Sequence, residues 1–157
     1  MSRKVPRSHD PEYILDVIEH VGRLAVESKC AVFGFAHDPK PERRFGLSVV
    51  GLRAWVRGCA QGVVDPDMRF DEGLSGKEDF DICVQSLEKS RLCWQDRRWT
   101  FVAKAWDLHG GMRTIRTHEK DQRDLLYLQI KWGRTVIKAG GTPKQNKRGQ
   151  RLQIGVP

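Results

Sequence analysis

Stretches with the 3.6-residue period of a helix alternate with short apolar runs along this chain, and this alternation constrains the fold most. Residues 11–29 carry apolar side chains at three- and four-residue steps, which gives a helix one apolar face. Asp10 is suited to the N-cap of that helix and Pro11 to its first position. Residues 30–35 follow as an apolar run containing Gly34, which predicts a short buried strand whose backbone approaches another segment closely.

The remainder of the chain continues the alternation. Further strands are predicted over residues 45–57, 91–105 and 135–138, and further helices over residues 77–90 and 117–132, with turns and loops over residues 58–73. This order predicts an α/β fold in which a mixed sheet is flanked by helices. We expect residues 1–138 to form a single α/β domain and residues 139–157 to form a basic, mobile C-terminal tail.

The basic excess of the chain lies near its C-terminal end. Residues 1–109 carry 17 basic and 17 acidic side chains, whereas residues 110–151 carry 11 basic and 3 acidic ones, which accounts for the net charge of +8. A basic region of this kind suits a polyanion such as DNA. The alternative is a solvated tail that keeps the chain soluble. The residues expected to contact DNA phosphates are Lys144, Lys147, Arg148 and Arg151.

Several protein classes do not fit the composition. No apolar run approaches the roughly 20 residues of a membrane helix, and no apolar segment follows the first residues as in a secretory signal. The four cysteines are scattered without a CxxC pair, which argues against a zinc site and against a disulfide framework. We therefore expect a cytoplasmic protein without membrane contact, in which these cysteines are reduced and mostly buried: Cys30, Cys59, Cys83 and Cys93.

Three carboxylates crowd the start of the helix predicted over residues 77–90, at Glu78, Asp79 and Asp81. Acidic residues at a helix start interact favourably with the free N–H groups and the helix dipole, so capping alone could explain them. Three acids within four residues exceed what a cap requires. Their mutual repulsion would raise at least one pKa, which suits a general base that takes a proton from an attacking hydroxyl.

A short loop before the last predicted helix combines glycines with arginines. The paired glycines Gly110 and Gly111 allow backbone N–H groups to approach an oxygen-rich ligand. Arg113 and Arg116 add charged donors suited to phosphate, and the helix start that follows can also face an anion. A diglycine alone usually marks a turn. His109 could be a metal ligand, a hydrogen-bond donor or an ordinary loop histidine.

The sequence Asp65-Pro66-Asp67 has the spacing of the DxD metal motif of nucleotide-sugar enzymes. Its position in a turn-like region favours a structural turn, because aspartate and proline are typical turn residues. We therefore predict a turn here and no metal ligand.

Five short motifs follow one another along the chain: residues 31–35 (AVFGF), 44–48 (RFGLS), 67–72 (DMRFDE), 76–81 (GKEDFD) and 110–114 (GGMRT). In this order they resemble the TET/JBP-associated glycosyltransferases. These are GT-A-like enzymes of bacteriophages and some eukaryotes that attach sugars to hydroxymethylated pyrimidines in DNA. The matching region runs from about Tyr13 to Trp132, and the likeness is to the C-terminal, acceptor-side part of the family's fold.

The resemblance implies a role for each motif. Asp79 would be the base for the acceptor hydroxyl, and the loop over residues 109–116 would lie near the diphosphate of a nucleotide-sugar donor such as a UDP-sugar. A divalent metal, Mn²⁺ or Mg²⁺, would assist, and the basic C-terminal region would contact DNA. The family's nucleotide-binding half, with its Asp-rich metal motif, has no counterpart before Pro11. We expect a second polypeptide to supply that half, unless the chain is part of a longer protein or has lost catalysis.

Two other functions fit parts of the sequence. A non-catalytic nucleic-acid-binding protein could keep the fold and use only the basic region. A metal-dependent nuclease could use Asp79 and Asp81 with His109, although the chain contains no HxH, HNH or clear two-metal pattern.

Overall fold

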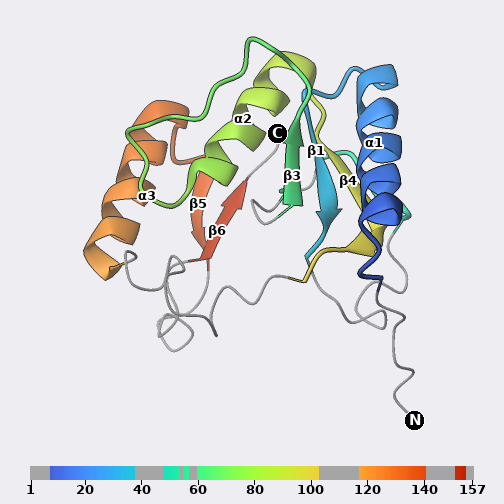
Figure 1. Cartoon of the computed structure of the whole chain (residues 1–157). Helices are drawn as coiled ribbons and strands as arrows, with labels where there is room; N and C mark the ends of the chain where they lie inside the picture. Colours follow the sequence, from blue (N-terminus) through green and yellow to red (C-terminus); the bar gives the residue numbers. More distant parts are fainter. Residues whose placement is uncertain are drawn as a thin grey trace. The chain divides into compact units, whose positions relative to one another are not determined.

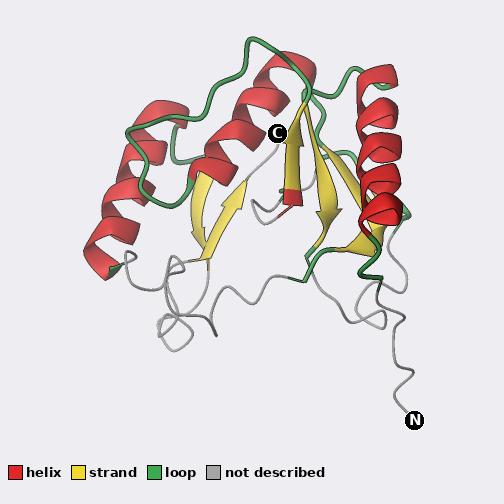
Figure 2. Cartoon of the chain, viewed as in Figure 1, coloured by secondary structure: helices red, strands yellow, loops and turns green. Residues whose placement is uncertain are grey.

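The computed structural model describes residues 8–37, 48–53, 55–56, 60–102, 117–140 and 151–154. Helices and strands alternate in this part of the chain as predicted (Figures 1 and 2), and the α/β class with a mixed sheet is confirmed. The elements are α1 (Pro11–Glu27), β1 (Val32–Ala36), β2 (Val50–Gly51), β3 (Gln61–Val63), α2 (Glu78–Ser90), β4 (Trp94–Thr100), α3 (His118–Trp132), β5 (Ile137–Gly140) and β6 (Arg151–Ile154).

The chain divides into two compact units that are interleaved in sequence. The first lies within Met1–Met68 and Ser86–Val102, and the second within Arg69–Gln85 and Ala103–Pro157. One of the boundaries between the units, after Gln85, therefore falls inside α2. Neither unit is a continuous stretch of sequence, so neither has a linker that composition could reveal.

The four-stranded sheet belongs to the first unit and has the order β2-β4-β1-β3. β1 is parallel to β4, with Phe33 beside Trp94, and antiparallel to β3, with Val32 beside Val63. β2 is antiparallel to β4. All five residues of β1 are buried, which explains why this strand reads as a continuous apolar run and not as an alternating one.

The helix α1 packs its apolar face into the core of the first unit. The side chain of Asp10 accepts the backbone N–H of Glu12 at 3.1 Å, and proline opens the helix, so the predicted cap is confirmed. Its buried residues belong to one apolar cluster. Three members come from α1 and the other three from β1 and the residues just before it: Val17, Val21, Ala25, Cys30, Phe33 and Phe35.

Gly34 lies at the close backbone approach that its sequence position predicts. A Cβ atom added there would lie 2.7 Å from the carbonyl oxygen of Ala60 and would contact the side chain of Val56. The site has no room for a methyl group, because a backbone carbonyl cannot move aside as a flexible side chain can.

Gly34→Ala is therefore expected to lower the free energy of unfolding by about 1–3 kcal/mol through overpacking. Gly22→Ala is the matched control. Gly22 lies inside α1, where an added Cβ would meet the ring of Phe33 at an ordinary 3.5 Å. Alanine also has the higher helix propensity, by about 1 kcal/mol, so the control should be neutral or stabilising. Urea unfolding of both variants measures the difference, and equal stabilities would contradict the close approach.

The second unit contains α3 and the β5–β6 pair. The side chain of Thr117 caps α3 by accepting the N–H of Lys120, and Gly133 ends the helix with a φ of 89°. Such a backbone conformation favours glycine. The side-chain amide of Gln129 donates to the carbonyl oxygen of Ile137 at 3.2 Å, which joins α3 to β5. β5 and β6 are antiparallel.

Three strands differ from the predictions. β3 lies within residues 58–73, which were predicted to be mostly turn and loop, and it pairs with β1. β6 occurs where a basic tail was expected and pairs with β5. β2 is shorter than the strand structure predicted over residues 45–57. Several residues of that range lie outside the described part of the chain. In each case a partner strand supplies the backbone hydrogen bonds, and strand formation depends on that context more than on local propensity.

The structure also bears on the predicted chemistry of the cysteines. Cys30, Cys83 and Cys93 are buried, as expected, and Cys59 lies outside the described residues. Burial, helped by the neighbouring Cys93, raises the pKa of the Cys30 thiol to about 11. Among the described helices, none combines the length and the apolar character needed to cross a bilayer.

Candidate active site

Helix α2 begins with the three carboxylates that the sequence places at its start. Glu78, Asp79 and Asp81 all lie in its first turn, and we call them the acidic tip. The carbonyl oxygen of Lys77 accepts the N–H groups of Phe80 and Asp81, at 3.1 Å and 3.3 Å, so the helix starts from Lys77. Glu78 and Asp79 are partly buried, whereas Asp81 is completely buried. Two carboxylates of the acidic tip thus lie near the surface and one inside.

The buried carboxylate of Asp81 accepts hydrogen bonds from three side chains. The indole Nε1 of Trp132 donates to Oδ1 at 2.7 Å, and Nζ of Lys131 lies 2.9 Å from the same oxygen. The amide of Gln85 donates to Oδ2 at 2.6 Å. Two of these donors come from the end of α3, so Asp81 ties the start of α2 to α3. These contacts favour a positioning role for Asp81, and its predicted catalytic role stays a prediction.

Lys131 also forms an ion pair with a second carboxylate, that of Asp71. Its Nζ lies 2.7 Å from Oδ2 of Asp71, which also accepts the hydroxyl of Tyr127 at 3.0 Å. The backbone N–H of Gly73 donates to Oδ1 at 2.9 Å. The hydrogen bond from Lys131, helped by that from Gly73, lowers the pKa of Asp71. Asp71 is therefore ionised at neutral pH and fixed against α3.

Two further contacts hold the segment between Asp71 and the acidic tip. Nζ of Lys77 lies 3.1 Å from Oδ1 of Asp121, and the two side chains are only 2% and 5% exposed. The hydroxyl of Ser75 donates to Oδ2 of Asp124 at 2.9 Å, and its backbone N–H donates to the same oxygen at 3.1 Å. Buried charges are costly unless they are paired and hydrogen-bonded, as these are.

The anchoring residues of α3 form one set, the α3 clamp: Asp121, Asp124, Tyr127, Lys131 and Trp132. Residues three or four apart lie on the same side of a helix, so one side of α3 can contact the chain from residue 71 to residue 81. Figure 1 shows α3 beside the first turns of α2. The clamp holds the acidic tip and the segment before it by charged and polar contacts at several points. Catalytic side chains need such support to keep their geometry.

The glycine and arginine loop joins α3 at the end nearest Lys77. The predicted diphosphate-binding residues and the predicted metal ligand all lie outside the described residues: His109, Gly110, Gly111, Arg113 and Arg116. Thr117, which follows them, caps α3, and Asp121, one turn later, contacts Lys77.

The structure does not test the predicted DNA-binding residues or the predicted metal site. Lys144, Lys147 and Arg148 lie outside the described residues, and Arg151 begins β6, where its backbone pairs with Gly140. In the described ranges no three His, Cys, Asp or Glu side chains come together as a group that could hold a metal ion. The roles predicted in DNA binding and metal binding remain predictions.

The Asp65-Pro66-Asp67 motif forms the turn that the sequence favours. The side chain of Asp65 accepts the backbone N–H of Asp67 at 2.9 Å. Nζ of Lys89 lies 2.7 Å from Asp65 and 3.4 Å from Asp67, and this pair lies in the first unit. Both carboxylates thus have a structural partner.

The α3 clamp was missing from the predicted site. The sequence assigns no site role to Lys77 or Lys131. One sequence pattern could have indicated the clamp. In α3, Asp121 and Asp124 share the helical spacing of the buried leucines Leu125 and Leu128. A charge on the buried side of a helix needs a partner, but the sequence does not say which one.

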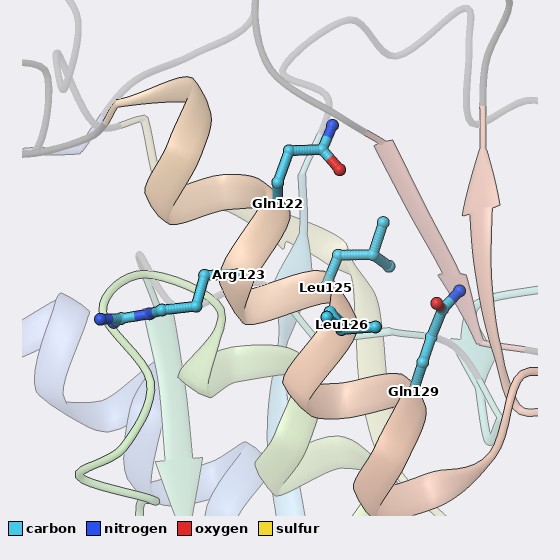
Figure 3. Close-up of a pocket in the computed structure, with 5 residues that line it drawn as sticks. All are labelled: Gln122, Arg123, Leu125, Leu126 and Gln129. Atoms are coloured by element: carbon cyan, nitrogen blue, oxygen red, sulfur yellow. The ribbon is translucent and has the colours of Figure 1, made fainter.

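A hollow on another part of α3 is lined by helix residues alone: Gln122, Arg123, Leu125, Leu126 and Gln129. In Figure 3, Gln122, Leu125 and Gln129 point to one side of the helix and Arg123 to the other. Its polar side chains do not converge on a common point. It is therefore a weaker candidate for ligand binding than the acidic tip.

Compared with known proteins, the chain matches no family model, no curated protein and no solved structure. Its function must be argued from the contacts above. A carboxylate fixed at a helix start can take a proton from a bound hydroxyl. A segment with paired glycines and arginines, such as the sequence over residues 110–116, can bind a phosphate.

Proposed function

We propose that this chain provides the acceptor side of a glycosyltransferase that moves a sugar from a nucleotide-sugar to a hydroxymethylated pyrimidine in DNA. One observation carries the proposal. The α3 clamp anchors the acidic tip of α2, and α3 begins where the glycine and arginine loop ends. The acidic tip contacts α3 through Asp81, at the C-terminal end of this helix, and the sequence predicted to bind phosphate immediately precedes its N-cap, Thr117. The order of sequence motifs supports the same reading.

The roles of the residues follow from the chemistry. Asp79 takes the proton of the acceptor hydroxymethyl group as its oxygen attacks the anomeric carbon of the sugar. A new glycosidic bond forms while the bond to the nucleoside diphosphate breaks, and Arg113 and Arg116 stabilise the negative charge of that leaving group. The donor-binding half is expected on a second polypeptide or elsewhere in a longer chain. We assign to it the divalent metal that the family resemblance implies.

The acceptor is expected to be duplex DNA. The basic residues from 110 to 151 supply the positive charge that phosphates require, without reading the base sequence. A base stacked inside a duplex cannot reach a carboxylate held on the protein, so the target nucleotide has to flip out of the stack. For a bacteriophage enzyme the reaction would take place in the cytoplasm of the host.

The test is a transfer assay on the chain co-purified from its native host with whatever binds it. The assay offers a UDP-sugar labelled in its sugar to duplex DNA that contains hydroxymethylcytosine, hydroxymethyluracil or only ordinary bases. We expect label in the hydroxymethylated DNA alone. Tight, strongly salt-dependent DNA binding without donor binding would instead identify a non-catalytic nucleic-acid-binding protein. Metal-dependent cleavage of the DNA would identify a nuclease.

A further inference from the structure

We infer that Lys131 and Trp132, at the end of α3, are positioning residues that orient the acidic tip of α2. The inference rests on the proposed function, in which Asp79 of that tip accepts the proton. Neither residue is assigned contact with substrate. They act through Asp81, whose Oδ1 lies 2.9 Å from Nζ of Lys131 and 2.7 Å from the indole nitrogen of Trp132.

Helical geometry explains how an anchor at Asp81 orients Asp79. Successive residues of an α-helix are about 100° apart around its axis, so Asp79 and Asp81 are about 200° apart. When Asp81 faces α3, Asp79 is directed to nearly the opposite side of α2. Rotation or lifting of the first turn would move both side chains together, because both belong to the same turn.

Lys131 pairs with two carboxylates, those of Asp81 and Asp71. Its Nζ also lies 2.7 Å from Asp71, which precedes the acidic tip in sequence. The segment from Asp71 to Asp81 is therefore held by one cation at both of its ends. Among the described residues, loss of that cation would leave the buried Asp81 with the neutral donors Trp132 and Gln85.

Lys89 provides a matched control within the same helix. Its Nζ also bridges two carboxylates, at 2.7 Å from Asp65 and 3.4 Å from Asp67. It lies at the opposite end of α2 and contacts neither Asp79 nor Asp81 in any pair described above. Lys89→Met thus removes a similar bridge without touching the acidic tip.

The first measurement is hydrogen exchange at the amides of Phe80 and Asp81, which bond to the carbonyl oxygen of Lys77. In Lys131→Met we expect exchange at these amides to be at least about tenfold faster, because the first turn opens locally. Lys89→Met should leave it unchanged, and Lys131→Arg should restore most of the protection. Trp132→Phe removes one donor and little volume, and is expected to have a smaller effect of the same kind.

The second measurement is the transfer rate of the native assembly. A shift of about 1 Å in a reacting group can cost about a hundredfold in rate, so Lys131→Met should lower kcat while KM stays within a small factor. Equal exchange and equal kcat in Lys131→Met and Lys89→Met would overturn the inference. If Lys131→Met does not fold, Trp132→Phe with unchanged exchange at Phe80 and Asp81 would overturn it instead. Absence of transfer in the native chain would refute the proposed function, and the exchange result would still decide the positioning role.

Discussion

Asp79→Asn is expected to reduce sugar transfer by about 10²–10⁴-fold, the range over which a positioned general base accelerates a reaction. The asparagine side chain has nearly the same shape but cannot take the proton from the acceptor hydroxyl at neutral pH. The helix would lose a favourable charge at its start, which is a small effect. The fold and the affinity for DNA should therefore be preserved. The measurements are kcat for transfer, the Kd for DNA, and thermal unfolding.

Glu78→Gln is the matched control for this variant. Glu78 precedes Asp79 in the same turn, and it too is partly buried. The change removes one charge from the acidic tip, just as Asp79→Asn does, so a purely electrostatic role would give equal losses. We expect a small loss in Glu78→Gln. A large loss there with none in Asp79→Asn would move the base to Glu78, and no loss in either would contradict base catalysis by the acidic tip.

Lys77→Met is expected to lower the free energy of unfolding by about 3–5 kcal/mol, the usual cost of leaving one member of a buried ion pair without its partner. Lys77 is 1% exposed and Asp121 is 3% exposed, so water cannot replace the lost ammonium. The buried carboxylate of Asp121 would lose the ammonium group that lies 3.1 Å from it. Urea unfolding at neutral pH measures the change.

Two controls separate this cause from a general loss of packing. Lys77→Met combined with Asp121→Leu removes both charges and should recover much of the lost stability, because an apolar pair can replace a buried ion pair. Lys89→Met breaks the half-exposed bridge to Asp65 and Asp67 and should cost far less than Lys77→Met. If the double variant were as unstable as Lys77→Met, the buried charge of Asp121 would not be the cause.

Features that depend on neighbours in sequence could be predicted. The start of α1 was recognisable because its N-cap and first residue, Asp10 and Pro11, act over a single turn. The tight packing at Gly34 was predictable because a glycine inside an apolar strand usually has a packing reason. The acidic tip was visible because its three carboxylates are close along the chain.

Features that depend on distant partners could not be predicted. The residues of the α3 clamp are 44 to 60 positions from the groups that they bind, for example Asp121 from Lys77 and Lys131 from Asp71. A hydrophobic period shows that α3 has a buried side, but it does not identify the charged groups that face that side. The strands β3 and β6 were missed for a related reason, since their hydrogen-bond partners lie elsewhere in the chain.

The amino-acid sequence by itself determined the α/β class, the three helices and the presence of an acidic turn at the start of α2. These follow from side-chain period and from capping, which are local properties of the chain. Only the tertiary structure decided that Asp81 lies inside and serves as an anchor, while Glu78 and Asp79 remain near the surface. The physical reason is that burial of a carboxylate depends on donors brought to it in space, and here Lys131 and Trp132 of α3 provide them.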